Sequence, residues 1–171
     1  MSPEPAESNG PLDPGAEVVG RSTSRQKRRV DALDVEATVL HGFDMKKDES
    51  TLHAAYNDAQ GVTERFNKNM LARINRELGG SFRLDSFQHV AFWNERMSRI
   101  EMHLESRVEQ QVWVQALARC FHFSPGERIH TENSYKFTQD SIADLLERSG
   151  LRVEEQWTDT RGWFSEVMAR V

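Results

Sequence analysis

The chain has 171 residues, a formal net charge of −5 and a single cysteine. Its length suits one domain, its acidic balance argues against nucleic acid or a membrane surface as a general partner, and one cysteine excludes an internal disulfide framework. With 37% hydrophobic residues and no apolar run long enough to cross a membrane, the sequence predicts a globular protein in a reducing, cytoplasmic location.

Residues 1–40 are predicted to form a disordered, low-complexity tail. Residues 1–20 hold four of the five prolines and almost no large apolar side chains, so they cannot bury enough surface to offset the entropy of ordering. Residues 21–29 carry five positive charges, which we interpret as a solvated basic segment, with nucleic-acid binding as the less favoured alternative. Val39 and Leu40 are compatible with a short strand ahead of Gly42.

Two helices are predicted between residues 48 and 79. Asp48 is a suitable N-cap for the first, in which Leu52 and Tyr56 share a face. In the second, Gly79 is a suitable stop. Apolar residues recur every fourth position along it, as in a helix that packs on a core: Val62, Phe66, Met70, Ile74 and Leu78.

Three strands are predicted at residues 87–93, 99–107 and 111–117, and we expect them to form one antiparallel sheet under the second helix. The middle strand alternates, so Ile100, Met102 and Leu104 are expected to face the core, and Glu101, His103 and Glu105 to face solvent. Cys120 lies in the apolar run that follows and is expected to be a buried, inert thiol.

Residues 129–137 form an extended segment in which Glu132 and Ser134 fall on one face, and Thr131, Asn133 and Tyr135 on the other. A carboxylate and a hydroxyl two residues apart on one face can hold a small polar ring or an amine. Glu-x-Ser is equally an ordinary pattern on the wet face of a strand.

A third helix is predicted between Thr138, its N-cap, and Gly150, its stop, with Ile142, Leu145 and Leu146 facing the core. Residues 151–158 and 163–171 read as a β-hairpin. Apolar hairpin residues would lack a full partner and favour association: Trp157, Trp163, Phe164 and Val167.

Four blocks of this sequence carry a resemblance to a known family. They are residues 42–48, residues 55–63 continuing through 66–69, residues 99–102 and residues 131–137. In this order and spacing they resemble the carboxyl-terminal half of the S-adenosylmethionine-dependent histidine Nα-methyltransferases of ergothioneine biosynthesis. The similarity runs from about Gly42 to the end of the chain.

The resemblance implies an α+β fold in two parts after the tail. Residues 41–137 would form a substrate-binding region, an antiparallel sheet with packed helices. Residues 138–171 would be a terminal helix and β-hairpin left from the Rossmann-like sheet of a class I methyltransferase. The family's Glu-x-Gly-x-Gly cofactor loop and its Ser-Thr-x-Gly-Asn segment are missing from the sequence, so we interpret the chain as truncated and assign no cofactor-binding residue.

The resemblance also implies an activity, the transfer of a methyl group from S-adenosylmethionine to the α-amino group of histidine. Glu132 and Ser134 would hold the imidazole ring, and the phenol hydroxyl of Tyr56 would donate a hydrogen bond to the substrate carboxylate. Three further residues would line the pocket: Thr63, Phe66 and Met102. No catalytic residue is assigned, because methyl transfer from a sulfonium depends mainly on positioning the nucleophilic nitrogen.

Alternatives remain open. The chain could be a non-catalytic remnant or a substrate-binding module, and a separate cofactor-domain chain or self-association would then complete it. A variant within the family acts on a tryptophan-derived substrate, but Glu132 and Ser134 favour the polar imidazole over an indole. The six histidines show no metal-ligand spacing along the sequence, so no metal site is predicted.

Overall fold

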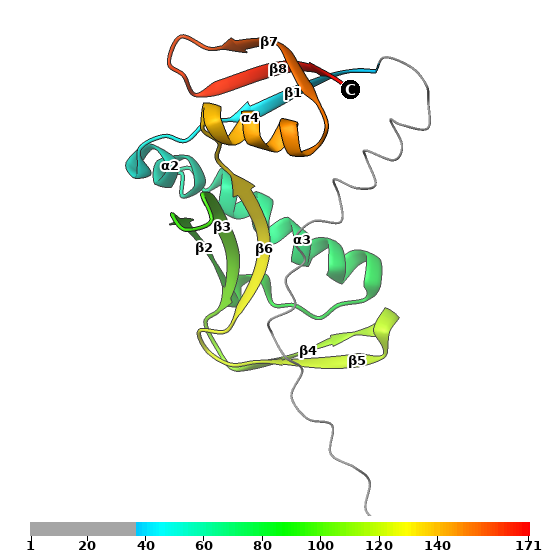
Figure 1. Ribbon diagram of the computed structural model, residues 1–171. Helices are drawn as coiled ribbons and strands as arrows, with labels where there is room; N and C mark the ends of the chain where they lie inside the picture. Colours follow the sequence, from blue (N-terminus) through cyan, green and yellow to red (C-terminus); the bar gives the residue numbers. More distant parts are fainter. Residues whose placement is uncertain (1–36) are drawn as a thin grey trace, which may run out of the picture.

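The computed structural model describes residues 37–171, and the predicted tail of residues 1–36 lies outside the described residues. The fold is α+β, and every pairing between its strands is antiparallel (Figure 1). In chain order the elements are β1 Thr38–Asp44, α2 Glu49–Tyr56, α3 Val62–Leu78, β2 Phe87–Asn94, β3 Arg99–Ser106, β4 Gln110–Val114, β5 Arg119–Phe123, β6 Arg128–Tyr135, α4 Gln139–Arg148, β7 Arg152–Thr158 and β8 Phe164–Arg170.

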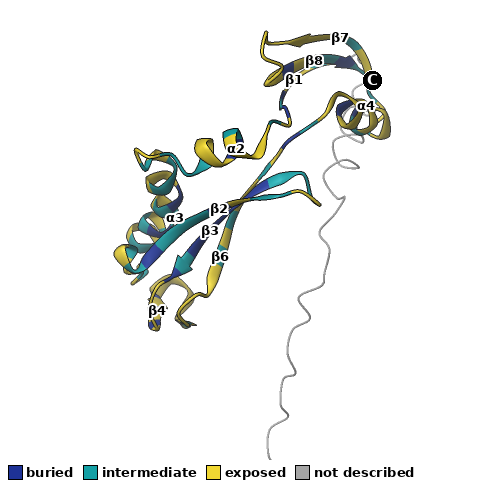
Figure 2. Cartoon of the chain, turned by 90° about the vertical axis from the view of Figure 1, so that its left-hand side faces the viewer, coloured by how far each residue is buried: buried dark blue, intermediate teal, exposed yellow. Residues whose placement is uncertain are grey.

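The first sheet has the strand order β2-β3-β6, and α3 packs against one of its faces (Figure 2). Leu71 of α3 is fully buried against Phe87 and Leu104, which confirms the predicted helix on an apolar sheet face. The third predicted strand is present as β4, but its predicted place in this sheet is wrong, because β4 pairs with β5 in a separate two-stranded sheet. A hydrogen bond from Gln115 N to Gly79 O ties the end of β4 to the end of α3 instead, so β6 takes the place beside β3.

Cys120 on β5 is exposed, which corrects the expectation of a buried thiol. The strand β5 pairs only with β4 among the described elements, and its five residues are exposed or half-buried. Cys120 pairs with Trp113, which is 47% exposed, on the outer face of the β4-β5 hairpin, whereas Val112 and Val114 on the inner face are buried. A two-stranded hairpin that is covered on one face leaves the residues of its other face in water.

The strand β3 is central in its sheet, and this position changes the environment of its polar residues. Ile100, Met102 and Leu104 are buried as predicted. Glu101 and His103 are each only 8% exposed, although they were expected to face solvent. Side chains from the two flanking strands and from β3 itself cover them, so a polar residue on a central strand is not necessarily exposed to solvent.

Local capping signals set the helix ends. The Asp48 carboxylate accepts a hydrogen bond from Thr51 N at 2.8 Å and begins α2. Thr138 and Ser141 form a reciprocal capping box at the start of α4. Gly79 follows the last residue of α3 with φ +63°, a left-handed conformation that suits glycine. No helix among residues 37–171 is long and apolar enough to span a membrane.

The second sheet has the order β1-β8-β7, with α4 on one face. Its strand β1 begins at Thr38, so the tail boundary predicted at residue 40 falls inside a strand. Val167 is 1% exposed and packs with Ile142 of α4, so it does not lack a partner. Three neighbouring aromatic residues are exposed as expected, at 46%, 37% and 45%: Trp157, Trp163 and Phe164.

The two sheets meet where β1 leads into α2 and β6 leads into α4. Met45 and Phe137 form a parallel bridge, Lys46 N donates to Phe137 O at 2.8 Å, and Phe137 N donates to Asp44 O at 2.9 Å. These backbone bonds hold the ends of β1 and β6 side by side, and the side chains of Asp44 and Lys136 come together there.

Candidate functional site

Lys136 is the centre of a polar cluster between the two sheets. Its side chain has no exposed surface, and its Nζ donates three hydrogen bonds of 2.7 Å, to the Tyr56 hydroxyl, the Ser134 hydroxyl and Asp44 Oδ2. An ammonium group has three donors, so the buried cation is fully satisfied. The cluster thus joins α2, β6 and β1.

Asp44 is the counter-ion of this cation. Burial alone would raise the pKa of Asp44, but hydrogen bonds from Lys136 and Lys47 outweigh it and hold the pKa below its ordinary value. The carboxylate therefore stays charged at neutral pH and compensates the ammonium of Lys136.

The hydroxyls of Tyr56 and Ser134 also share a hydrogen bond of 2.6 Å. Each oxygen accepts from Lys136, and one of the two donates to the other. Two hydroxyl protons are present and one is used between them, which leaves one O–H free to donate to a ligand. The pair can therefore serve one acceptor group, such as a carboxylate oxygen, at a time.

The register of β6 places Glu132 and Ser134 on the helix-covered face of the sheet, opposite Met102 and Ile100 respectively. The predicted shared face is thereby present. A β-bulge opposite the step from Met102 to His103 makes Thr131 an extra residue in β6, and its hydroxyl donates to Met102 O at 2.8 Å. Strict alternation therefore fails at Thr131, which lines the same pocket as Glu132.

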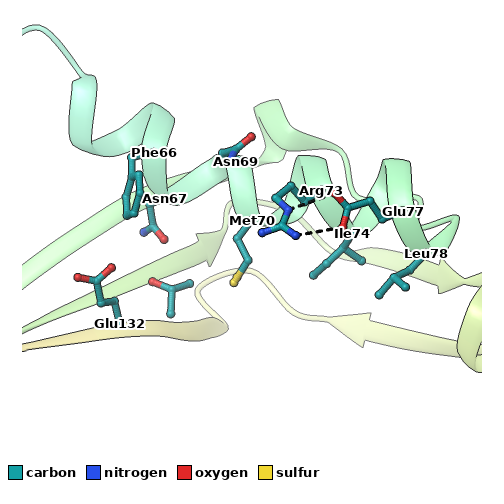
Figure 3. A pocket seen from close by; sticks show the side chains of 10 residues that line it. Phe66, Asn67, Asn69, Met70, Arg73, Ile74, Glu77, Leu78 and Glu132 are labelled. Atoms are coloured by element: carbon teal, nitrogen blue, oxygen red, sulfur yellow. Dashed lines mark hydrogen bonds and ion pairs between the residues drawn. The ribbon is translucent and has the colours of Figure 1, made fainter.

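A pocket of about 450 Å³ lies between α3 and β6. Figure 3 shows Glu132 on one side of it and Phe66 on the other. Phe66 is 65% exposed, a large solvent-accessible aromatic ring across from an exposed carboxylate. The lining residues are Phe66, Asn67, Asn69, Met70, Arg73, Ile74, Glu77, Leu78, Thr131 and Glu132. Of the two carboxylates in the lining, Glu77 accepts hydrogen bonds from Arg73. The aromatic and aliphatic wall together with the Glu132 carboxylate suits a small ligand that has a flat face and an N–H donor.

The six residues predicted from the resemblance occupy four kinds of place. Tyr56 and Ser134 belong to the Lys136 cluster, and Glu132 and Phe66 line the pocket. Met102 is 2% exposed and packs in the core beside them.

Thr63 does not line the pocket. At the start of α3, its hydroxyl donates to Ala55 O at 3.3 Å, and its backbone N donates to Asp58 Oδ1 at 2.8 Å. The functional roles of all six residues remain predictions.

Two members of the cluster were missed by the sequence reasoning. Lys136 and Asp44 both lie within blocks that carry the resemblance, but they are 92 residues apart and no local pattern pairs them. Asn67 was missed as well. It is 3% exposed, donates to His103 O at 3.1 Å, and so fixes the pocket-lining helix to β3.

Residues 21–171 match the family described as histidine-specific methyltransferase, SAM-dependent. The match begins ahead of Gly42 and includes the basic segment of residues 21–29, which the motif blocks had placed outside the resemblance. Histidine N-alpha-methyltransferase of Mycolicibacterium smegmatis is 45% identical over 139 residues, 81% of this chain and 43% of that protein.

The protein of the same name from Mycobacterium tuberculosis is 44% identical over 132 residues, 77% of this chain and 41% of that protein. Ergothioneine biosynthesis protein 1 of Schizosaccharomyces pombe is 24% identical over 129 residues, 75% of this chain and 16% of that protein. The chain thus spans about two fifths of the length of its two mycobacterial relatives.

Proposed function

The chain belongs to the SAM-dependent, histidine-specific methyltransferase family, and we propose that it is the substrate-binding part of an enzyme that methylates the α-amino group of histidine. The observation that carries this proposal is the pocket between α3 and β6, in which Glu132 lies across from the exposed ring of Phe66. A charged acceptor and an aromatic face are what an imidazole with an N–H donor requires.

The substrate carboxylate would be held by the Tyr56–Ser134 pair. In this arrangement the Ser134 hydroxyl donates a hydrogen bond to the Tyr56 oxygen. The Tyr56 O–H then donates a hydrogen bond to the substrate carboxylate, since only one hydroxyl proton of the pair remains available. Two ammonium groups, those of Lys136 and Lys47, share the single carboxylate of Asp44, and this net positive charge beside the pair favours an anionic group there. Glu132 would then hold the ring mainly by itself. Met102 would shape the surroundings from the core, and Thr63 from the first turn of α3.

A histidine substrate is favoured over a tryptophan-derived one for a chemical reason. An imidazole can donate to the Glu132 carboxylate while its other nitrogen remains hydrated, whereas an indole would bring a larger apolar surface against that carboxylate. An unpaired polar group at a binding site strongly disfavours the wrong ligand.

The finer fold assignment is also a proposal. In the β1-β8-β7 sheet, β1 and β7 are both antiparallel to β8 and so run parallel to each other, with α4 ahead of β7. This supports the interpretation of the sheet as one end of a Rossmann-like sheet. The division at residues 41–137 and 138–171 then needs one change, because β1 pairs with β8 and belongs with the second part.

The residues that the structure describes do not fit the methyl donor by themselves. The family uses a Gly-rich loop after a sheet strand, and within residues 37–171 no two glycines are separated by a single residue. We therefore propose that a cofactor-binding region elsewhere, in the same protein or in a second chain, supplies S-adenosylmethionine and completes the reaction.

Titration calorimetry of the purified chain with histidine tests the substrate site. We expect a binding heat with histidine. We also expect Glu132→Ala to lower the affinity for histidine about tenfold or more, since a charge-assisted hydrogen bond contributes roughly 1.5–3 kcal/mol. Asn133→Ala is the matched control, because Asn133 is the neighbouring exposed residue on the opposite face of β6.

Unchanged affinity in Glu132→Ala, with a native circular dichroism spectrum, would contradict the site assignment. A parallel titration with S-adenosylmethionine separates the alternatives. Histidine binding without cofactor binding would identify a substrate-binding module, whereas binding of both would show a complete site in this chain.

A further inference from the structure

Three potential metal ligands converge on the face of the β2-β3-β6 sheet that lies away from α3. Glu101, His103 and His130 each offer one ligand atom, and these atoms lie within 4.8 Å of one another. Glu101 and His103 are two residues apart on β3, and His130 is paired with His103 across the ladder. The bulge at Thr131 creates this grouping. Without the extra residue, strict alternation would place His130 on the same face as Glu132, which is the face covered by α3, and away from His103.

The His103 ring is buried and rigidly held, but one of its nitrogens is unused. The ring stacks between Phe92 at 5.3 Å and His130 at 4.5 Å, measured between ring centroids. Within the described residues, Nδ1 of His103 has no hydrogen-bond partner although the residue is only 8% exposed. A buried polar atom without a partner is costly, and a bound ion is one of the ways in which proteins satisfy it.

The other two side chains are oriented by hydrogen bonds that leave a ligand atom available. Glu101 receives bonds from Arg99 Nε and Nη2 at 2.9 and 2.7 Å and from Asn94 Nδ2 at 2.8 Å, all of them at Oε1. Its Oε2 receives none from the residues that the structure describes. His130 Nε2 donates to Asn133 Oδ1 at 2.8 Å, which leaves a lone pair on Nδ1.

Such bonds to the far side of each ligand are the usual support of metal-binding histidines and carboxylates. We propose that Glu101, His103 and His130 bind a divalent transition-metal ion, with Zn²⁺ as the ion that fits this donor set best. Two imidazoles and one carboxylate are a common ligand set for Zn²⁺, and a water molecule completes four-coordination. Ligands about 2.1 Å from a tetrahedral ion lie roughly 3.4 Å apart, so the ligand atoms must close by up to about 1.4 Å on binding. The His130 ring must also turn out of its stack on His103, because an imidazole binds a metal in the plane of its ring.

His130 is exposed, so it provides both the freedom to close and the route by which an ion arrives. The ion would cross-link β3 and β6 next to the bulge. Since Glu132 follows Thr131 on β6, the metal would stiffen the strand that carries the pocket. This inference does not depend on the proposed methyl transfer, because it rests on the opposite face of the sheet.

Titration calorimetry of the metal-free full chain with Zn²⁺, in a buffer without free histidine, tests the site. We expect one ion per chain and a rise in melting temperature on Zn²⁺ addition. His130→Asn should lower the affinity by more than the roughly 10–100-fold that losing an outer-sphere partner costs. His130 is the residue of choice because it is exposed, so its replacement should leave the fold intact.

Cys120→Ser and His122→Asn are the matched controls, since these residues lie two positions apart on one face of β5 and could bind zinc on their own. Retention of the Zn²⁺ affinity in both controls, with its loss in His130→Asn, supports the proposal. Absence of any Zn²⁺ heat, unchanged affinity in His130→Asn, or loss of binding in either control would overturn it.

Discussion

At the scale of single residues, Lys136 shows how a buried charge can be placed at the junction of two sheets. Its ammonium donates one hydrogen bond each to Tyr56, Ser134 and Asp44, so no N–H donor of this buried group is left without a partner. The exposure of the two charged partners differs, since the Lys136 side chain is fully buried whereas that of Asp44 is 41% exposed. Removing one partner should therefore not be equivalent to removing the other.

We predict that Asp44→Asn lowers the free energy of unfolding by about 2–4 kcal/mol, because it leaves a buried cation without a counter-ion. Lys136→Met should cost only about 1–2 kcal/mol, since water can reach the abandoned carboxylate. Urea unfolding followed by circular dichroism at neutral pH measures both.

The double variant should be less destabilised than the sum of the two single variants. Lys68→Met is the matched control, as Lys68 pairs with Glu64 on the surface of α3 and should change the free energy by no more than about 0.5 kcal/mol. Equal costs for Asp44→Asn and Lys136→Met would contradict this account of the cluster.

At the scale of elements, carboxylates that accept backbone hydrogen bonds hold the starts of α2 and α3. Asp58 accepts from Thr63 N and Val62 N at 2.8 Å each, and these bonds lower its pKa to about 2. The hydroxyls of Ser50 and Thr51, with the backbone N of Thr51, lower the pKa of Asp48 to about 2. Protonation weakens both caps, so helix stability at these ends depends on pH.

The sign follows from linkage. The folded-state pKa of Asp58 lies below its value in an unfolded chain, so its contribution is complete above about pH 4 and is lost as the pH falls towards about 2. We predict that the difference in unfolding free energy between wild type and Asp58→Asn shrinks between about pH 5 and about pH 2.

Thr138→Ala is the comparison, because it removes an uncharged cap at the start of α4. Thr138→Ala should lower the free energy of unfolding by about 1 kcal/mol, and by the same amount at about pH 5 and at about pH 2. A wild-type to Asp58→Asn difference that stays constant with pH would count against the capping role of the charged carboxylate.

At the scale of the whole molecule, the two sheets are covered unequally. The β1-β8-β7 sheet packs α4 on one face, while Leu40, Trp157 and Phe164 on the opposite face are 63%, 46% and 45% exposed. Among the described strands, β1 also has a free edge. An apolar face beside an unpaired edge favours association with another protein surface.

We predict that the chain self-associates in a concentration-dependent way through this face, as measured by sedimentation velocity. Trp157→Lys combined with Phe164→Lys should weaken association more than about tenfold, since buried aromatic residues dominate most interfaces. Trp113→Lys is the control, because Trp113 is 47% exposed but lies on β4, in another sheet. A monomer at all concentrations, or an equal effect of the control, would refute this use of the surface.

The sequence by itself determined the helices and most strands of this protein. Asp48, Gly79 and Thr138 marked helix ends, and the alternation of β3 and β6 predicted which apolar residues are buried and that Glu132 and Ser134 share a face. These signals are local, since capping bonds and periodicity involve residues only a few positions apart. The resemblance in four ordered blocks led to the family in the same way, because each block is a short run of side chains.

Only the tertiary structure decided how these pieces meet. It paired β6 rather than β4 with β3, brought Asp44 to Lys136 across 92 residues, and buried His103 beside His130. One inserted residue at the bulge turns His130 to one face of the sheet while Glu132 keeps the other. Strand partners and register depend on contacts between distant segments, and a shift of one residue exchanges the faces, so local periodicity could not specify them.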